Sequence, residues 1–215
     1  MKTIGLLGGT FDPIHLGHIR MAQAFKAQLT LDEMRLLPCH LPPHKATPAR
    51  SSAQRLDMVR LALQALPELQ VDARELLREQ ASYTIDTLAE LREEQGSEVS
   101  LCWCVGMDSL VNLNRWHRWR ELLDYGHLVV AARPGWSLPV EGEVADWLGR
   151  HRIEPQGLVE RAAGGVVIAP LGLVDISSTQ LREALSGRSL KAPLDWREQL
   201  PPTVYDYIEQ QRLYR

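Results

Sequence analysis

The chain has 215 residues, of which 45% are hydrophobic, and this is enough apolar material for one substantial buried core. We therefore expect a single domain over residues 1–215. Lys and Arg number 24 against 27 Asp and Glu, so the formal net charge is only -3. Because the composition gives no broad positive field, we expect no nucleic-acid partner and no membrane partner, and any anion binding must be local.

The first apolar run is broken by Gly8 and Gly9, which makes it too short for a signal peptide or a spanning helix. We therefore expect a cytoplasmic protein. The three cysteines, Cys39, Cys102 and Cys104, form no CxxC pair. Neither a disulfide framework nor a protein metal site is predicted, and Cys102 and Cys104 are expected to be buried strand residues.

Short apolar runs alternate with segments of helical period along the whole chain, which is typical of βαβ units around a parallel sheet. In chain order, we predict a strand at 4–7, a helix at 18–29, a strand at 34–37, a helix at 51–66, a strand at 69–71, a helix at 84–94, a strand at 99–105, a helix at 119–123, a strand at 127–132, a helix at 144–148, a strand at 166–169, and helices at 179–185 and 203–211. The pattern predicts a Rossmann-like, doubly wound α/β fold whose mostly parallel sheet carries helices on both faces.

Local signals support several of these boundaries. The run 99–105 is polar on neither side, so it belongs in the centre of the sheet. Ser51 with Gln54 has the spacing of a capping box. Residues 134–165 mix Pro, Gly and charge, and we interpret them as a connection that contains one helix.

Residues 8–18, Gly-Gly-Thr-Phe-Asp-Pro-Ile-His-Leu-Gly-His, lie directly between the first strand and the first helix. In open α/β sheets, ligands bind at this junction. Gly8 and Gly9 allow backbone amides to approach a ligand, and Gly17 clears a helix start where free N–H groups attract anions. This segment therefore predicts a phosphate site.

The side chains of the same segment have matching chemistry. His15 and His18 are three residues apart, so both imidazoles can face one bound group, and Thr10 can add a hydroxyl. Taken singly, each of these residues is better explained by a turn or by a helix start; together they favour phosphate binding. A Walker A loop and a GxGxxG fingerprint are both excluded, since Gly9 is followed by Thr10-Phe11 and the glycine spacing is wrong.

Residues 9–18 resemble the HxGH signature of the nucleotidyltransferase superfamily, and residues 176–182, Ile-Ser-Ser-Thr-Gln-Leu-Arg, resemble its ISSTxxR motif. Ser177 with Gln180 has capping-box spacing, which would leave the next amides free. The resemblance implies that ATP phosphates are held by the hydroxyls, the amides and Arg182. The expected ATP-binding residues are Gly8, Gly9, Thr10, Phe11, Gly17, Ile176, Ser177, Ser178 and Thr179.

Over nearly its whole length the chain is similar to bacterial nicotinate mononucleotide adenylyltransferases. Residues 38–45 resemble the PPHK loop of that family, and residues 82–88 resemble its SYT-x-DTL segment. The resemblance assigns His44, Lys45, Tyr83, Thr84, Trp116 and His117 to nicotinate mononucleotide. In that assignment Trp116 stacks on the pyridine ring, and free amides near Thr84, a natural N-cap, receive the nicotinate carboxylate.

Two further strand ends belong to the ATP side in this resemblance. Gly106 and Asp108 match a GxD segment near adenosine, and Arg133 ends a strand at the presumed ligand edge. The implied reaction is an in-line attack on the α-phosphorus of ATP, with Mg²⁺ bound to the polyphosphate. His15, His18, Lys45 and Arg182 are the expected catalytic residues.

Other functions remain open on the sequence. Nicotinamide mononucleotide and phosphopantetheine are alternative acceptors, although the Thr84 and Trp116 segments favour the nicotinate compound. A nucleotide-binding regulatory module without turnover is a different class, and an RNA-charging role lacks a basic stripe. A homo-oligomer is compatible with the sequence.

Overall fold

A computed structural model describes residues 1–42, 48–132, 137–171, 176–187 and 196–215. Six strands form one sheet in the order β3-β2-β1-β4-β5-β6, and every neighbouring pair among them is parallel. The strands are β1 (Lys2–Gly9), β2 (Glu33–Pro38), β3 (Gln70–Val71), β4 (Val99–Gly106), β5 (His127–Ala132) and β6 (Val166–Pro170). The strand order reverses between β1 and β4, as the doubly wound prediction requires.

The helices in the described part of the chain are α1 (Leu16–Gln28), α2 (Ser52–Leu63), α3 (Thr84–Gln95), α4 (Met107–Val111), α5 (Leu122–Tyr125), α6 (Glu143–His151), α7 (Gly157–Glu160), α8 (Ser178–Leu185) and α9 (Pro202–Gln210). Short 3₁₀ turns cover Arg74–Leu77, Leu113–Arg115, Trp119–Glu121 and Trp196–Gln199. All predicted helices are present. The prediction of one helix within 134–165 was wrong, because α7 follows α6, and a four-residue helix is too short to show a period.

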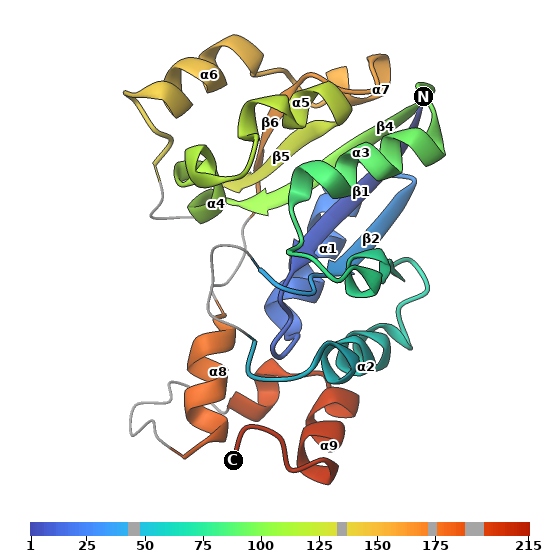
Figure 1. Ribbon diagram of the computed structural model, residues 1–215, viewed down its shortest axis with the longest axis vertical. Coiled ribbons are helices and arrows are strands. Elements are labelled where there is room, and N and C mark those ends of the chain that lie inside the picture. The colour runs from blue at the N-terminus through green and yellow to red at the C-terminus, as the bar shows by residue number, and fades with distance from the viewer. Residues whose placement is uncertain (43–47, 133–136, 172–175, 188–195) are drawn as a thin grey trace.

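Side chains of β4 show how the sheet builds two cores. Leu101 and Trp103 point into the layer that contains α3, α5 and α6, whereas Cys102 and Cys104 point into the layer that contains α1, α2 and α9. The alternation follows from the two-residue period of a strand that is covered on both faces. The expected central position of β4 and the expected helices on both faces are confirmed (Figure 1).

The cysteines are structural in this arrangement. Cys102 and Cys104 are buried and no cysteine forms a disulfide. Burial raises the pKa of the Cys102 thiol to about 12, so the thiol stays protonated at neutral pH. The described residues include no helix with the length and apolar character needed to cross a bilayer.

Helix starts test the capping predictions. The Ser51–Gln54 capping box is confirmed, with the Gln54 N–H donating to Ser51 Oγ over 3.2 Å. The Ser177–Gln180 box was wrong, because Ser177 is the N-cap but its side chain caps no amide. Thr84 was also wrong as an N-cap, since it is the first helical residue and Tyr83 holds the cap position without a side-chain bond.

Candidate active site

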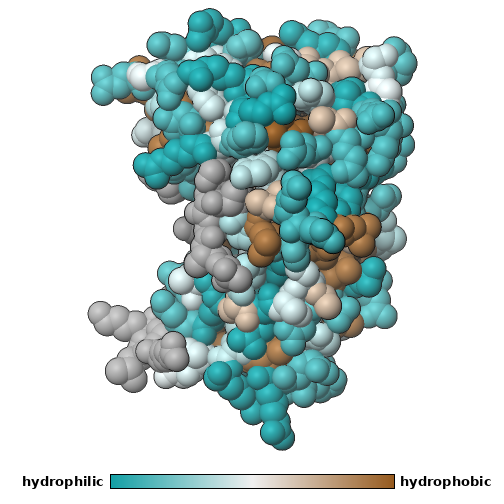
Figure 2. Space-filling model, viewed as in Figure 1, coloured by the Kyte–Doolittle hydropathy of each residue, from teal (hydrophilic) through white to brown (hydrophobic). Residues whose placement is uncertain are grey.

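Among the described residues, the predicted glycines Gly8, Gly9 and Gly106 lie at the edge of the sheet where the parallel strands end. Gly9 at the end of β1 pairs with Pro38 at the end of β2, and Gly106 at the end of β4 pairs with Ala131 of β5. From β1 the chain enters α1 on one face of the sheet, and from β4 it enters α4, whose Met107 and Leu110 pack on the other face. In doubly wound sheets, ligands bind where two such connections diverge at the reversal of strand order. On the face in Figure 2 hydrophilic residues cover most of the surface, and hydrophobic residues gather near the middle of the molecule.

The two histidines of the first motif are in direct contact. Their rings stack with centroids 3.7 Å apart at an interplanar angle of 24°. The backbone N–H of His15 donates to His18 Nδ1 over 3.3 Å. Because Nδ1 of His18 is an acceptor, the neutral ring carries its proton on Nε2, which makes Nε2 the hydrogen-bond donor of that ring. The rings of Phe11 and His18 are nearly perpendicular, with their centroids 5.0 Å apart.

The glycines of this motif are required by packing as well as by backbone approach. A Cβ at Gly8 would lie 2.7 Å from Cζ2 of Trp103, and a Cβ at Gly9 would lie 2.8 Å from the Phe11 ring. A Cβ at Gly17 would lie 3.0 Å from His15 Nδ1 and 3.1 Å from Cβ of Ile176. The start of α1 is therefore closely packed against His15 and against Ile176 of the second motif.

The second motif reaches the first across most of the chain. Arg182 of α8 donates from Nη1 to the carbonyl oxygen of Asp12 over 2.7 Å, across 170 sequence positions. The Ser178 hydroxyl donates to the carbonyl oxygen of Pro13 over 3.1 Å. These bonds place the start of α8 beside the loop between β1 and α1, so the two motifs lie side by side (Figure 1).

Asp12 is a buried anchor whose role no sequence pattern indicates. Its Oδ1 accepts from the hydroxyl of Tyr214 over 2.6 Å, and its Oδ2 accepts from the backbone N–H of Ala49 over 2.6 Å. Burial, together with the hydrogen bond to Asp12, raises the pKa of the Tyr214 hydroxyl above its usual range. The guanidinium of Arg50 lies 4.9 Å above the Tyr214 ring. The loop thus holds the carboxyl-terminal segment as well as α8.

On the acceptor side, the rings of Tyr83 and His117 lie 4.6 Å apart between centroids. Trp116 is half-buried against the core on the α3 side of the sheet. Ser82 ties this region to the loop after β2: its Oγ accepts from the His40 N–H over 3.0 Å, and its own N–H donates to the Leu41 carbonyl over 3.0 Å. Of the described residues predicted for the acceptor, Tyr83 and His117 are in contact next to Thr84, the first residue of α3.

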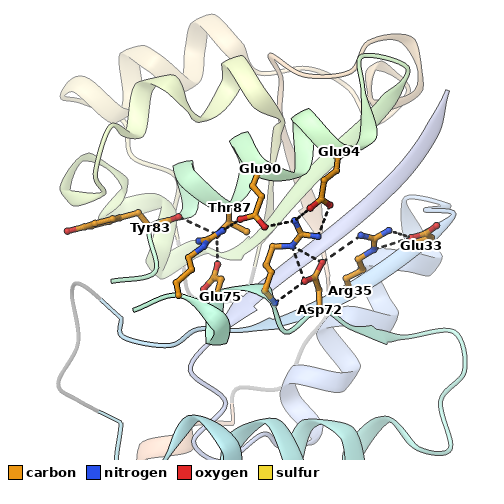
Figure 3. A network of polar contacts seen from close by, with 10 residues as sticks. Glu33, Arg35, Asp72, Glu75, Tyr83, Thr87, Glu90 and Glu94 are labelled. Atoms are coloured by element: carbon orange, nitrogen blue, oxygen red, sulfur yellow. Dashed lines mark hydrogen bonds and ion pairs between the residues drawn. The ribbon is translucent and has the colours of Figure 1, made fainter. Parts of the chain in front are cut away.

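A polar network supports the start of α3 from behind (Figure 3). The Thr87 hydroxyl donates to the buried carboxyl group of Glu75 over 2.7 Å and accepts from Arg78 over 2.7 Å. Arg78 also pairs with Glu90 one turn further along α3. Burial raises the pKa of Glu75, and its hydrogen bonds with Thr87 and Ser82 oppose that rise. The network fixes the start of α3 next to Tyr83.

The remaining predicted residues are less constrained by contacts. Gly106 is the N-cap of α4, and Asp108 is an exposed carboxylate in its first turn. Thr179 receives a bond from Arg182 over 3.1 Å. His44, Lys45 and Arg133 lie outside the described residues. Within the described ranges no group of three or more His, Cys, Asp or Glu side chains is placed to hold a metal ion.

Comparison with known proteins identifies the family. The cytidylyltransferase-like family model matches residues 6–184. A Cellvibrio japonicus protein named probable nicotinate-nucleotide adenylyltransferase is 50% identical over 213 residues, which cover 99% of each chain. One of the same name from Aeromonas salmonicida is 52% identical over 99% of this chain and 97% of its own. The chain belongs to the nicotinate-nucleotide adenylyltransferase family.

Solved structures give the same fold. The Plasmodium falciparum nicotinic acid mononucleotide adenylyltransferase complexed with NaAD has a TM-score of 0.73 at 16% identity, and the match covers 100% of this chain and 98% of that one. A putative nicotinate-nucleotide adenylyltransferase from Vibrio parahaemolyticus has a TM-score of 0.63 at 17% identity, with 100% and 96% covered. The α/β architecture of this family is therefore the architecture found here.

Proposed function

We propose that this protein transfers the adenylyl group of ATP to the phosphate of nicotinate mononucleotide, releasing pyrophosphate and making nicotinate adenine dinucleotide for NAD biosynthesis. The observation that carries the proposal is the hydrogen bond from Arg182 to the Asp12 carbonyl, which holds the two motifs side by side. The names of relatives at about 50% identity support it. The product complex of the Plasmodium falciparum structure, which that protein's title states, supports the dinucleotide product.

The ATP side supplies donors at the places where charge develops. His18 offers Nε2–H and His15 stacks directly behind it, so this pair faces the α- and β-phosphates in our proposal. Arg182 and Lys45 neutralise the transferring and leaving oxygens, while the hydroxyls of Thr10 and Thr179 add donors. The acceptor phosphate is itself the nucleophile, so catalysis consists of in-line positioning and charge stabilisation.

The other proposed ATP contacts come from backbone and loop residues around these side chains. They are Gly8, Gly9, Phe11, Gly17, Gly106, Asp108, Arg133, Ile176, Ser177 and Ser178. Imidazole, guanidinium, hydroxyl and amide groups dominate this set, and such donors bind phosphate oxygens. The set therefore fits a Mg²⁺ ion that is carried mainly by the nucleotide; when bound with ATP, the ion neutralises phosphate charge.

The acceptor side offers a flat apolar face beside free amides. Trp116 stacks on the pyridinium ring, whose positive charge strengthens the contact. The first two amides of α3, at Thr84 and Ile85, receive the nicotinate carboxylate, since the first N–H groups of a helix have no partner within it. Tyr83 and His117 close the side of this pocket, and His44 with Lys45 approach the phosphate of the mononucleotide.

Acceptor choice tests the proposal. Purified protein is given ATP, Mg²⁺ and one of three acceptors: nicotinate mononucleotide, nicotinamide mononucleotide or phosphopantetheine, and pyrophosphate release is followed. We expect kcat/KM to be at least about 10-fold higher for the nicotinate compound, because the helix-start amides favour a carboxylate over an amide. Faster reaction with either other acceptor contradicts the substrate assignment. Nucleotide binding without pyrophosphate release supports a regulatory module instead.

We further propose that the chain acts as a single domain in the cytoplasm and has no nucleic-acid or membrane partner. Whether it forms a homo-oligomer is tested by light scattering coupled to gel filtration.

A further inference from the structure

Arg55 of α2 is a charged side chain inside the protein. It is 0% exposed, which makes it the largest fully buried side chain of the described residues. Its Nη1 donates to the Thr10 carbonyl over 2.7 Å, and its Nη2 donates to the His40 carbonyl over 3.1 Å and to Ser52 Oγ over 3.2 Å. Within the described ranges no carboxylate lies at ion-pair distance from it.

A buried guanidinium bound only to neutral oxygens is costly, because desolvation of the charge is not offset by an opposite charge. The location of its two hydrogen-bond partners indicates why this unfavourable burial is retained. Both carbonyls that it binds belong to loops that leave the ligand edge of the sheet: Thr10 follows β1, and His40 follows β2. Arg55 therefore ties the proposed ATP loop to the proposed acceptor loop.

The bond to Thr10 sets the orientation of one peptide group. The Thr10–Phe11 peptide is trans, so its carbonyl and its N–H point in opposite directions, and the Phe11 N–H points away from Arg55. No acceptor in the described part of the chain receives that N–H. Phe11 also has a φ of +49°, a left-handed conformation that a bulky residue keeps only when its surroundings impose it.

The same guanidinium connects further to the acceptor side. The His40 N–H donates to Ser82 Oγ, and Ser82 directly precedes Tyr83 and Thr84. A continuous chain of bonds thus runs from Thr10 through Arg55, His40 and Ser82 to the start of α3. Displacement of Arg55 would change the spacing between the two substrate loops.

We propose that Arg55 is a positioning residue that aims the Phe11 N–H at the ATP polyphosphate and sets the distance between the ATP loop and the acceptor loop. The negative polyphosphate supplies the opposite charge that the protein does not. This inference rests on the proposed adenylyl transfer for its kinetic test, but binding of pyrophosphate with Mg²⁺ tests it without turnover.

The experiment compares Arg55→Lys and Arg55→Met with Arg60→Met, which removes an exposed arginine from the same helix. Arg55→Lys keeps the charge but cannot hold both carbonyls in a fixed fork. We expect it to lower kcat/KM for ATP at least about 10-fold and to raise KM for ATP more than KM for nicotinate mononucleotide. Arg55→Met is expected also to lose at least about 10-fold in affinity for pyrophosphate by calorimetry.

A merely structural role for Arg55 would lower the fraction of folded enzyme and leave KM for ATP and pyrophosphate affinity unchanged; that result overturns the proposal. Wild-type kinetics in Arg55→Lys overturn it as well, and Arg55→Lys decides the matter if Arg55→Met does not fold. Losses of equal size in Arg60→Met also contradict it. If the wild-type protein binds pyrophosphate but makes no dinucleotide, the proposed function is refuted. The pyrophosphate affinities of the variants still test the role of Arg55 in that case.

Discussion

Gly8 packs closely against the buried ring of Trp103, and we expect Gly8→Ala to lower the stability of the fold. The added Cβ would lie 2.7 Å from Cζ2 and 3.1 Å from Cη2 of Trp103, which is only 4% exposed. Non-bonded carbon atoms prefer separations of about 3.5–4.0 Å, so the ring and the strand must separate by about 1 Å. In a packed interior such overpacking costs about 1–3 kcal/mol, and we expect that loss in the free energy of unfolding by urea.

Relief of the clash provides the sharper measurement. Trp103→Phe removes the indole atoms that the new Cβ would meet and by itself costs about 1–3 kcal/mol through the cavity it leaves. In Gly8→Ala/Trp103→Phe the methyl group enters part of that cavity. The double variant should therefore be more stable than the sum of the two single changes predicts, by at least about 1 kcal/mol.

Gly149→Ala is the matched control for backbone effects, because apart from its chain neighbours and the backbone of its own helix no atom lies within 4 Å of a Cβ added at this position. It should raise the free energy of unfolding by about 0.5–1 kcal/mol, as expected for Gly to Ala in a helix. Simple additivity of Gly8→Ala and Trp103→Phe would refute the steric explanation. A wild-type free energy of unfolding for Gly8→Ala alone would also refute it, even if the double variant were as stable as the wild type.

Three other changes test separate parts of the structure. His18→Ala should lower kcat by about 10²–10³-fold with little change in KM for nicotinate mononucleotide, since the lost donor acts on developing phosphate charge. Gly17→Ala places a Cβ 3.0 Å from His15 Nδ1 and 3.1 Å from Ile176 Cβ, so kcat/KM should fall about 10-fold while unfolding free energy changes by less than about 1 kcal/mol. Burial lowers the pKa of His127, whose Nδ1 accepts from the Gly165 N–H. The unfolded chain then takes up the proton first as pH falls below about 6.5, so stability is lost over that range, and His127→Asn should flatten the loss.

Each of these has an outcome against it. Near-normal turnover of His18→Ala removes the central residue of the proposed mechanism, and unchanged kinetics of Gly17→Ala mean that the two motifs tolerate separation. For His127, urea unfolding between pH 7 and pH 5 is the measurement; an equal decline in wild type and His127→Asn places the responsible protons elsewhere.

Sequence reasoning predicted the regular elements well because their signals are periodic. The run 99–105 has no polar face and forms a central strand, and the Ser51–Gln54 spacing forms the capping box it indicates. The short helices α4 and α7 were not predicted, because a helix of about one turn is too short to show a hydrophobic period. Ser177 failed as a box because its neighbours Ser178 and Arg182 bond to another loop, and tertiary contact outweighed local spacing.

The supporting residues of the site were beyond the sequence for a different reason. The histidines and glycines of the first motif are close together in the sequence, so their combination indicates a phosphate site before the fold is known. Asp12 and Arg55 act through partners that are distant along the chain, at Tyr214 and at Thr10. No sequence spacing relates positions so far apart. An arginine in a helix is usually a charged surface residue, so the sequence does not indicate that Arg55 is buried.

The bond between Asp12 and Tyr214 joins positions separated by 202 residues. During synthesis the amino-terminal loop therefore leaves the ribosome long before the tyrosine that fastens it. A nascent chain cannot form this hydrogen bond until position 214 has emerged from the exit tunnel, after the residues of the sheet and its covering helices have been made.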